Sequence, residues 1–135
     1  MTPENLGAWM LKGNADRVDL TGRFAAEPRV AQWCVRPGYR TLMMRAGQPV
    51  VFWASGSRAG LWGVGRLAGS ASLGEDGAWH VPLDLEIAPL SSRVPRAVLR
   101  ADARLVDLEV FRQPQGANPS FVTSEQFAVL RTYWS

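Results

Sequence analysis

The chain has 135 residues, of which 47% are hydrophobic and 20% charged, and its formal net charge is +3. This length and composition predict one folded domain over residues 1–135 and exclude a disordered chain. The basic balance is compatible with an acidic partner such as nucleic acid, and no apolar run approaches the roughly 18 residues that a membrane-spanning helix needs.

The first part of the chain alternates short apolar segments with turn signals. Residues 8–11 predict a strand, and residues 14–20 a turn or short helix. Residues 30–35 form a second apolar segment, and residues 39–45 predict a short helix. Residues 50–54 are apolar on both faces, which is typical of a central strand.

The middle of the chain contains the clearest strand pattern. Residues 61–67 predict a strand that places Gly63 and Gly65 on one face, so a ligand or a packed helix, more commonly the helix, should approach this backbone closely. Residues 69–78 are small, polar and glycine-rich, and predict a mobile loop. Trp79–Ile87 alternates apolar and polar residues, which predicts a half-buried strand.

The last part of the chain ends in a marked helix. Residues 95–107 predict a helix, residues 109–112 a closing strand, and residues 113–120 an irregular segment. Thr123 and Gln126 have the spacing of a capping box at the start of the final helix. These five or six strands between short helices predict an α+β fold with a curled or barrel-like sheet.

The cysteine and histidine content limits both metal chemistry and redox setting. Cys34 is the only cysteine and His80 the only histidine, and together they cannot supply the three or four nitrogen and sulfur ligands of a zinc site. His80 is expected at the surface, on the outward face of its strand. No nucleotide-binding motif suggests a cofactor, and the single thiol and the polar first residues favour a cytoplasmic protein.

Catalysis by a recognisable residue set is not expected. The exception is Lys12, the only lysine, which ends a predicted strand. Burial there would lower its pKa and make it a nucleophile or base; the alternative is a phosphate contact or a surface cap.

The aromatic residues suit a binding pocket. Trp33 and Trp53 could stack on a flat ring, while Asn14 and Ser55 could bond its edge. The alternative, for each tryptophan, is that it packs in the core. We expect core positions for Trp9, Trp79 and Trp134, and leave Trp62 open.

The positive charge is concentrated within one segment. Residues 36–66 contain five arginines and no acidic residue. Arg36, Arg40 and Arg58, together with Tyr39, are therefore candidates for contacts with a nucleic-acid backbone.

Several ordered pieces of the chain resemble an EVE domain. They are Trp9-x-Leu11-Lys12-x-Asn14, Trp33-Cys34-Val35-Arg36-x-x-Tyr39-Arg40, Val50-Val51-Phe52-Trp53-Ala54-Ser55-Gly56, Leu61-Trp62-Gly63-Val64-Gly65 and residues 112–120. The resemblance covers nearly the whole chain and implies a PUA-like fold related to YTH and ASCH domains. It also implies a pocket that takes a modified base out of nucleic acid, DNA more than RNA.

The resemblance also implies which residues form the pocket. They are Lys12, Asn14, Trp33, Trp53 and Ser55, and we add Cys34 and Trp62 as further pocket candidates. Two departures stand out: many EVE domains carry Arg-Asn-Tyr where this chain has Arg36-Pro37-Gly38-Tyr39, and residues 69–78 lack an aromatic that could close the cage.

Two other functions remain open at this stage. A small amide hydrolase, as found among ASCH-type domains, would need Lys12 paired with a carboxylate. A module that binds a small molecule or a protein would not need arginines around its pocket.

Overall fold

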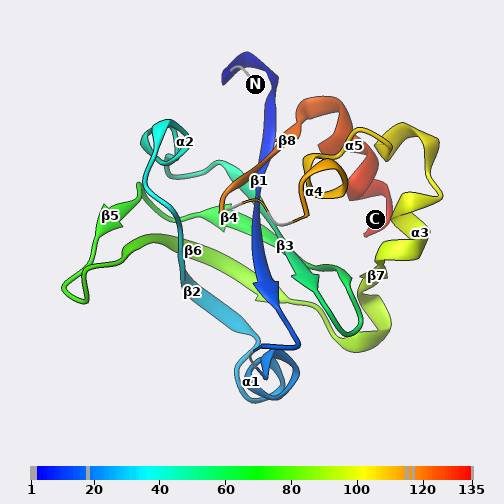
Figure 1. The fold of residues 1–135 in the computed structure, drawn as a ribbon, viewed down its shortest axis with the longest axis horizontal. Helices are drawn as coiled ribbons and strands as arrows, with labels where there is room; N and C mark the ends of the chain where they lie inside the picture. Colours follow the sequence, from blue (N-terminus) through cyan, green and yellow to red (C-terminus); the bar gives the residue numbers. More distant parts are fainter. Residues whose placement is uncertain (1–2, 18, 115, 117, 135) are drawn as a thin grey trace.

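The computed structural model describes residues 3–17, 19–114, 116 and 118–134. Within them a curled, unclosed sheet is surrounded by short helices (Figure 1), which confirms the α+β prediction. The strands are β1 (Leu6–Asn14), β2 (Arg29–Cys34), β3 (Pro49–Ser55), β4 (Gly60–Leu67), β5 (Ser72–Leu73), β6 (Trp79–Ile87), β7 (Val94–Pro95) and β8 (Ser120–Thr123). The α-helices are α1 (Leu20–Ala26), α2 (Tyr39–Leu42), α3 (Arg96–Arg100), α4 (Glu109–Arg112) and α5 (Ser124–Thr132), and the 3₁₀ turns are η1 (Pro3–Asn5), η2 (Leu90–Ser92) and η3 (Ala103–Leu105).

The main strands of the sheet follow the order β2-β6-β4-β3-β1-β8, while the short strands β5 and β7 pair with β6 and β4. The pair β1–β3 is parallel and the other pairs are antiparallel. The sheet curls until β2 approaches β1, where Trp33 Nε1 donates a hydrogen bond of 3.1 Å to the Lys12 carbonyl. This contact brings two strands from separate parts of the sheet together at the end of the curl.

Each face of the sheet has its own apolar core. Leu11 pairs with Phe52 on the face inside the curl, and both are fully buried there. Met10 pairs with Val51 on the opposite face, where residues from α5 and the segments before it complete the second core. Figure 1 shows α3, α4 and α5 gathered on this second side. Neighbouring residues of β1 and β3 therefore belong to different cores.

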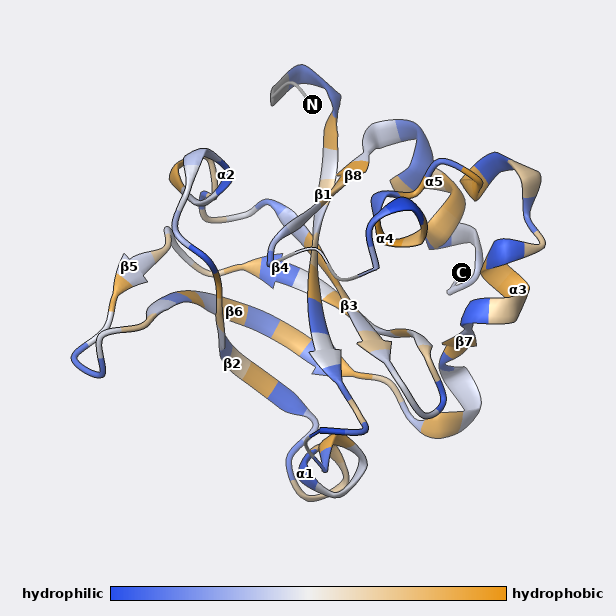
Figure 2. Ribbon diagram, in the orientation of Figure 1, coloured by the Kyte–Doolittle hydropathy of each residue, from blue (hydrophilic) through white to orange (hydrophobic). Residues whose placement is uncertain are grey.

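Strand β6 has the predicted bounds and the predicted alternation, visible as blue and orange segments in Figure 2. The two glycines of β4 do face a close neighbour, but that neighbour is β6 and not a helix. A Cβ at Gly65 would lie 2.2 Å from the Asp84 carbonyl oxygen, and one at Gly63 would lie 2.7 Å from the Glu86 carbonyl oxygen. The glycines therefore allow adjacent strands to bend tightly against each other.

Several elements differ from the sequence prediction, including β5, which lies within the predicted loop of residues 69–78. Residues 20–26 form α1, which starts where the Asp19 carboxylate accepts a hydrogen bond from Gly22 N. Residues 95–107 do not form one helix, because α3 ends at Arg100 and the Asp102 side chain caps η3 by accepting from Arg104 N. Residues 109–112 are helical and not a strand.

The final helix begins as predicted. Thr123 Oγ1 accepts from Gln126 N at 3.1 Å, and Gln126 Oε1 accepts from Thr123 N at 3.0 Å. Among the described helices, none has both the length and the hydropathy needed to cross a bilayer.

Candidate functional site

A cavity of about 320 Å³ opens between α1 and the ends of β1 and β2. Its lining consists of Gly13, Asn14, Leu20, Arg23, Gln32, Trp33, Cys34, His80 and Asn118. The cavity thus brings together three of the residues expected in the pocket, Asn14, Trp33 and Cys34. Its volume is at the lower end of the range for small-ligand sites.

Trp33 is held rigidly as one wall of this cavity. Its indole is fixed by the bond to the Lys12 carbonyl and packs edge-to-face on Phe52, with ring centroids 4.9 Å apart. The ring also lies against the backbone of Gly13, where an added Cβ would be 3.2 Å from Trp33 Cζ2. Gly13 therefore leaves the space that the indole occupies.

Arg23 covers part of the Trp33 ring. Its guanidinium carbon lies 5.2 Å from the Trp33 centroid and 5.7 Å from the Phe24 centroid, as in cation–π pairs. A flat ligand reaches this part of the indole only if Arg23, an exposed residue of α1, turns aside. The same guanidinium could then stack on the outer face of the ligand.

Asn118 closes the cavity from the segment before β8. Strand β8 pairs with β1 only as far as Met10. Beyond that point the Asn118 side chain forms the hydrogen bonds that a neighbouring strand would form. Its Oδ1 accepts from Lys12 N at 2.6 Å, and its Nδ2 donates to Lys12 O at 3.0 Å. Arg36 N donates to the Asn118 carbonyl at 2.9 Å, which ties the segment after β2 to the same residue.

Two further amides offer groups to a ligand. Asn14 Oδ1 accepts from Asp16 N at 2.9 Å, and within the described residues its Nδ2 donates to no protein atom. Gln32 is an exposed residue in the cavity wall. Amides of this kind can bond both donor and acceptor edges of a heterocyclic ring.

Cys34 and His80 form the outer rim of the cavity. Cys34 is exposed, and its Sγ lies 3.6 Å from His80 Nδ1. His80 Nε2 lies 2.9 Å from an Asp76 carboxylate oxygen. The pKa of Asp76 is lowered first by the Ala78 backbone N–H and then by His80, so this carboxylate stays charged and orients the imidazole. His80 is thus a cavity residue that was expected only at the surface.

Lys12 does not line the cavity. Its Nζ donates to the Gly116 carbonyl, on the other side of β1. Burial lowers its pKa, Glu109 opposes this effect, and Arg40 adds to it. No carboxylate of the described residues lies within ion-pair distance of Nζ. The lysine–carboxylate pair that the hydrolase alternative requires is therefore not formed.

Arg40 is engaged within the protein. Its guanidinium forms a two-bond ion pair with Glu109 and also donates to the Pro119 carbonyl at 3.2 Å. The hydrogen bond to Glu109 raises the pKa of Arg40 despite partial burial. This pairing occupies donors that the expected contact with a nucleic-acid backbone would use. Arg36, Tyr39 and Arg58 are exposed, as such contacts require.

The remaining candidates lie outside this cavity. Trp53 is 3% exposed and packs edge-to-face on Phe111 in the second core, so it is not a wall. The Ser55 hydroxyl donates to the Gly13 carbonyl at 3.4 Å, and Ser55 is not among the described residues that line the cavity. Trp62 is 1% exposed and donates from Nε1 to the Arg58 carbonyl.

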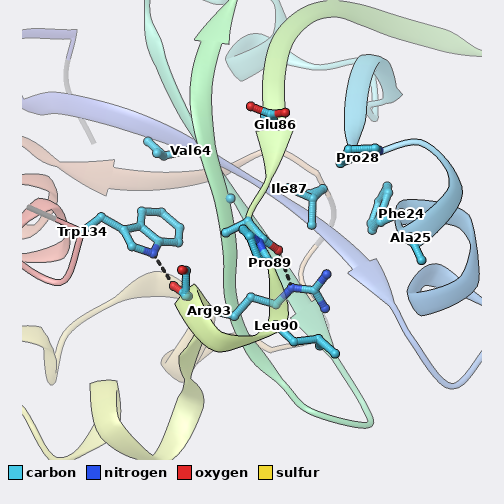
Figure 3. Close-up of a pocket in the computed structure, with 13 residues that line it drawn as sticks. Phe24, Ala25, Pro28, Val64, Glu86, Ile87, Pro89, Leu90, Arg93 and Trp134 are labelled. Carbon is cyan, nitrogen blue, oxygen red and sulfur yellow. Dashed lines mark hydrogen bonds between the residues drawn. The ribbon is translucent and has the colours of Figure 1, made fainter.

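A larger cavity, of about 720 Å³, lies beside Phe24 and Ala25 of α1 (Figure 3). It is lined mostly by apolar groups, including Phe24, Ile87 and Trp134, with Glu86 and Arg93 as its charged residues. We place the candidate site at Trp33, because a flat ring and several amides converge there. Nowhere in the described parts of the chain do three or more His, Cys, Asp or Glu residues form a group that could hold a metal.

Comparisons with known proteins show the fold alone. No family model matches the chain, and no curated protein matches it. Among solved structures, Rpa0253 from Rhodopseudomonas palustris has a TM-score of 0.69 at 17% identity, covering 95% of this chain and 92% of its own. PSPTO5229 from Pseudomonas syringae has a TM-score of 0.66 at 16% identity, covering 93% and 97%. A hypothetical protein from Leishmania major has a TM-score of 0.68 at 16% identity, covering 98% of each chain.

Proposed function

We propose that this domain binds a modified base, flipped out of nucleic acid into the cavity beside Trp33. The observation that carries the proposal is the fixed indole, which forms one wall of a cavity that also holds three side-chain amides. A flipped base needs a flat surface for stacking and a few polar groups along its edge. The cavity contains both.

Each lining residue has a part in this proposal. Trp33 stacks on the base, a contact that contributes about 1–3 kcal/mol. Arg23 turns away from the indole and covers the outer face of the base. Asn14 and Gln32 bond its edge, and Cys34 lies near the substituent that distinguishes the modified base.

The sequence pieces shared with EVE domains support the same function. They include Asn14 and Trp33, which both line the cavity, and the curled sheet agrees with a PUA-like fold. We therefore propose that the chain is an EVE-type reader that acts in the cytoplasm and takes its base from DNA. No step of the proposal needs a cofactor or a catalytic group.

A binding screen tests this function. Oligonucleotides that carry methylated or hydroxymethylated bases are titrated against the wild type, with unmodified oligonucleotides as controls. We expect Trp33→Ala to abolish binding and Gln32→Ala, an exposed substitution, to weaken it about tenfold through one lost hydrogen bond.

Trp134→Ala is the matched control, because Trp134 is a partly buried tryptophan that lines other cavities. It should leave affinity unchanged. Equal affinity of the wild type and Gln32→Ala, together with full binding by Trp33→Ala, would exclude this cavity as the site.

A further inference from the structure

Arg93, between η2 and β7, is fixed in the wall of the larger cavity. Its Nε donates to the Ala88 carbonyl at 2.9 Å, a bond drawn in Figure 3. Its guanidinium carbon lies 4.2 Å from the centroid of the Trp62 ring. One hydrogen bond and one stacking contact therefore hold this arginine in a single orientation.

Within the described residues, no carboxylate balances the charge of Arg93. Its Nη1 is buried and donates to no atom of the described residues. Among the described residues of the cavity wall, Glu86 is the only acidic one. It forms no ion pair with Arg93, and Figure 3 shows it at the other end of the cavity. Burial without a partner is costly for a charged donor, and burial also lowers the pKa of Arg93.

A second arginine lies beside the first. Arg58 follows β3 in a left-handed conformation with φ of +56°, and its carbonyl accepts from Trp62 Nε1 at 3.0 Å. Trp62 thus contacts Arg93 through its ring face and Arg58 through its N–H. The repulsion from Arg58 contributes to the lowered pKa of Arg93.

Arg58 and Arg93 line a cavity of about 340 Å³ in common. The rest of its lining is uncharged and consists of Ala59, Trp62, Leu90, Val94 and Pro95. Two cations that repel each other across an uncharged cavity form a site for an anion. Guanidinium groups bind phosphate oxygens through paired N–H donors.

We propose that Arg58 and Arg93 together bind a phosphate group, and that in the nucleic-acid complex this phosphate belongs to the strand whose base enters the cavity at Trp33. The nucleic-acid source of the phosphate rests on the proposed function, whereas the anion site itself does not.

The position of the two sites supports a shared strand. Phe24 of α1 contacts the Trp33 ring at 6.4 Å and the Trp62 ring at 6.3 Å between centroids. The base cavity and the arginine pair are therefore each bordered by an indole that contacts Phe24 of α1. A strand that crosses α1 would reach both.

The first arm of the test uses inorganic phosphate. It is titrated at constant ionic strength, with chloride as the balancing salt, while NMR follows the indole N–H of Trp62. We expect a saturable shift that disappears in both Arg58→Gln and Arg93→Gln. Arg66→Gln, at an exposed arginine that lines none of the described cavities, should keep it.

The second arm uses an oligonucleotide that carries the modified base selected by the screen. Arg58→Gln and Arg93→Gln should each reduce the slope of log affinity against log salt concentration by about 1. An unchanged slope in both variants, with binding still lost in Trp33→Ala, would overturn the nucleic-acid contact and leave the base cavity in place.

The two arms separate the two proposals. If the wild type binds no oligonucleotide, the proposed function fails, and the phosphate titration alone decides the arginine pair. A shift that is absent, or is equally large in Arg93→Gln, overturns the anion site whatever the oligonucleotides do.

Discussion

The side chain of Asn118 forms two hydrogen bonds with the backbone of Lys12, 106 residues earlier in the chain. It satisfies both backbone groups at the point where β8 no longer covers β1. The Lys12 carbonyl also accepts from Trp33 Nε1. The Lys12 carbonyl therefore links Trp33, which forms a wall of the cavity, to Asn118, which closes it.

Asn118→Ala should destabilise the fold and weaken ligand binding. It leaves Lys12 N without its acceptor, and an unsatisfied, partly buried backbone group costs about 1–3 kcal/mol. Urea denaturation should show a loss of this size in the free energy of unfolding. Gln113→Ala, an exposed substitution in the same segment, is the control and should change stability little. Equal stability of the two variants would contradict the role of the Asn118 amide.

Gly13→Ala should displace Trp33. The added Cβ would lie 2.9 Å from both Leu20 Cδ1 and Phe52 Cζ, and 3.2 Å from the indole. Overpacking of this kind costs about 1–3 kcal/mol, and it moves the stacking wall. We expect lower thermal stability together with weaker oligonucleotide binding.

Gly38→Ala is the matched control for this substitution. Its backbone is extended, and a Cβ there would meet no atom within 4 Å. Stability and affinity should both be unchanged. A loss of affinity equal to that of Gly13→Ala would show that the effect does not come from Trp33.

Strand positions were predictable where one face of a strand is buried. Trp79–Ile87 alternates because its odd-numbered residues enter the core, and that pattern is local. Strand β8 has four residues, and its identity comes from pairing with β1, which is distant in sequence. Residues 109–112 pair with no strand in the part of the chain that the structure describes. Their helical turn places Glu109 against Arg40, and no pattern within four residues encodes that contact.

The candidate site was partly predictable for the same reason. Trp33 and Asn14 share one cavity because β2 and β1 meet at the end of the curl. Trp53 pairs with Lys12 in the register of β3 and β1, so both face away from Trp33. To predict the face on which Trp53 lies, one must know the register between the two strands and which side of the sheet the helices cover. Asn118 and His80 enter the cavity through contacts between distant segments.

The ion pair between Arg40 and Glu109 should make stability depend on acid pH. Burial alone would raise the pKa of Glu109, but the hydrogen-bonded Arg40 guanidinium lowers it below its ordinary 4.5. The stabilisation is therefore complete above about pH 4.5 and is lost as the pH falls through the lower folded value. Glu109→Gln should lower the free energy of unfolding by about 2 kcal/mol at pH 7.

The difference between the wild type and Glu109→Gln should shrink as the pH falls through the lowered pKa of Glu109, because protonation then leaves a neutral group at this position in both proteins. Denaturation curves at several pH values measure this difference. Glu125→Gln controls for the general effect of removing one carboxylate, since Glu125 is exposed on α5. A difference that grows in acid would contradict the assigned direction of the pKa.

Alkylation of Cys34 should report occupation of the cavity. Cys34 is the only cysteine, it is exposed, and it lines the cavity beside Trp33. We expect iodoacetamide to label it in the free protein, and a bound oligonucleotide to slow the labelling in proportion to the fraction of protein occupied. Mass spectrometry of the intact protein measures the rate.

The reverse experiment uses the same thiol to block the site. Modification of Cys34 with a bulky maleimide should abolish oligonucleotide binding, whereas Cys34→Ser, which is smaller and cannot be alkylated, should retain binding in the presence of maleimide. Cys34 lies on the outer rim, so the adduct occupies the cavity mouth without entering either core. If the alkylated protein binds its ligand as well as the unmodified protein does, the ligand lies elsewhere. The cavity at Trp33 is then a feature of the fold and not the binding site.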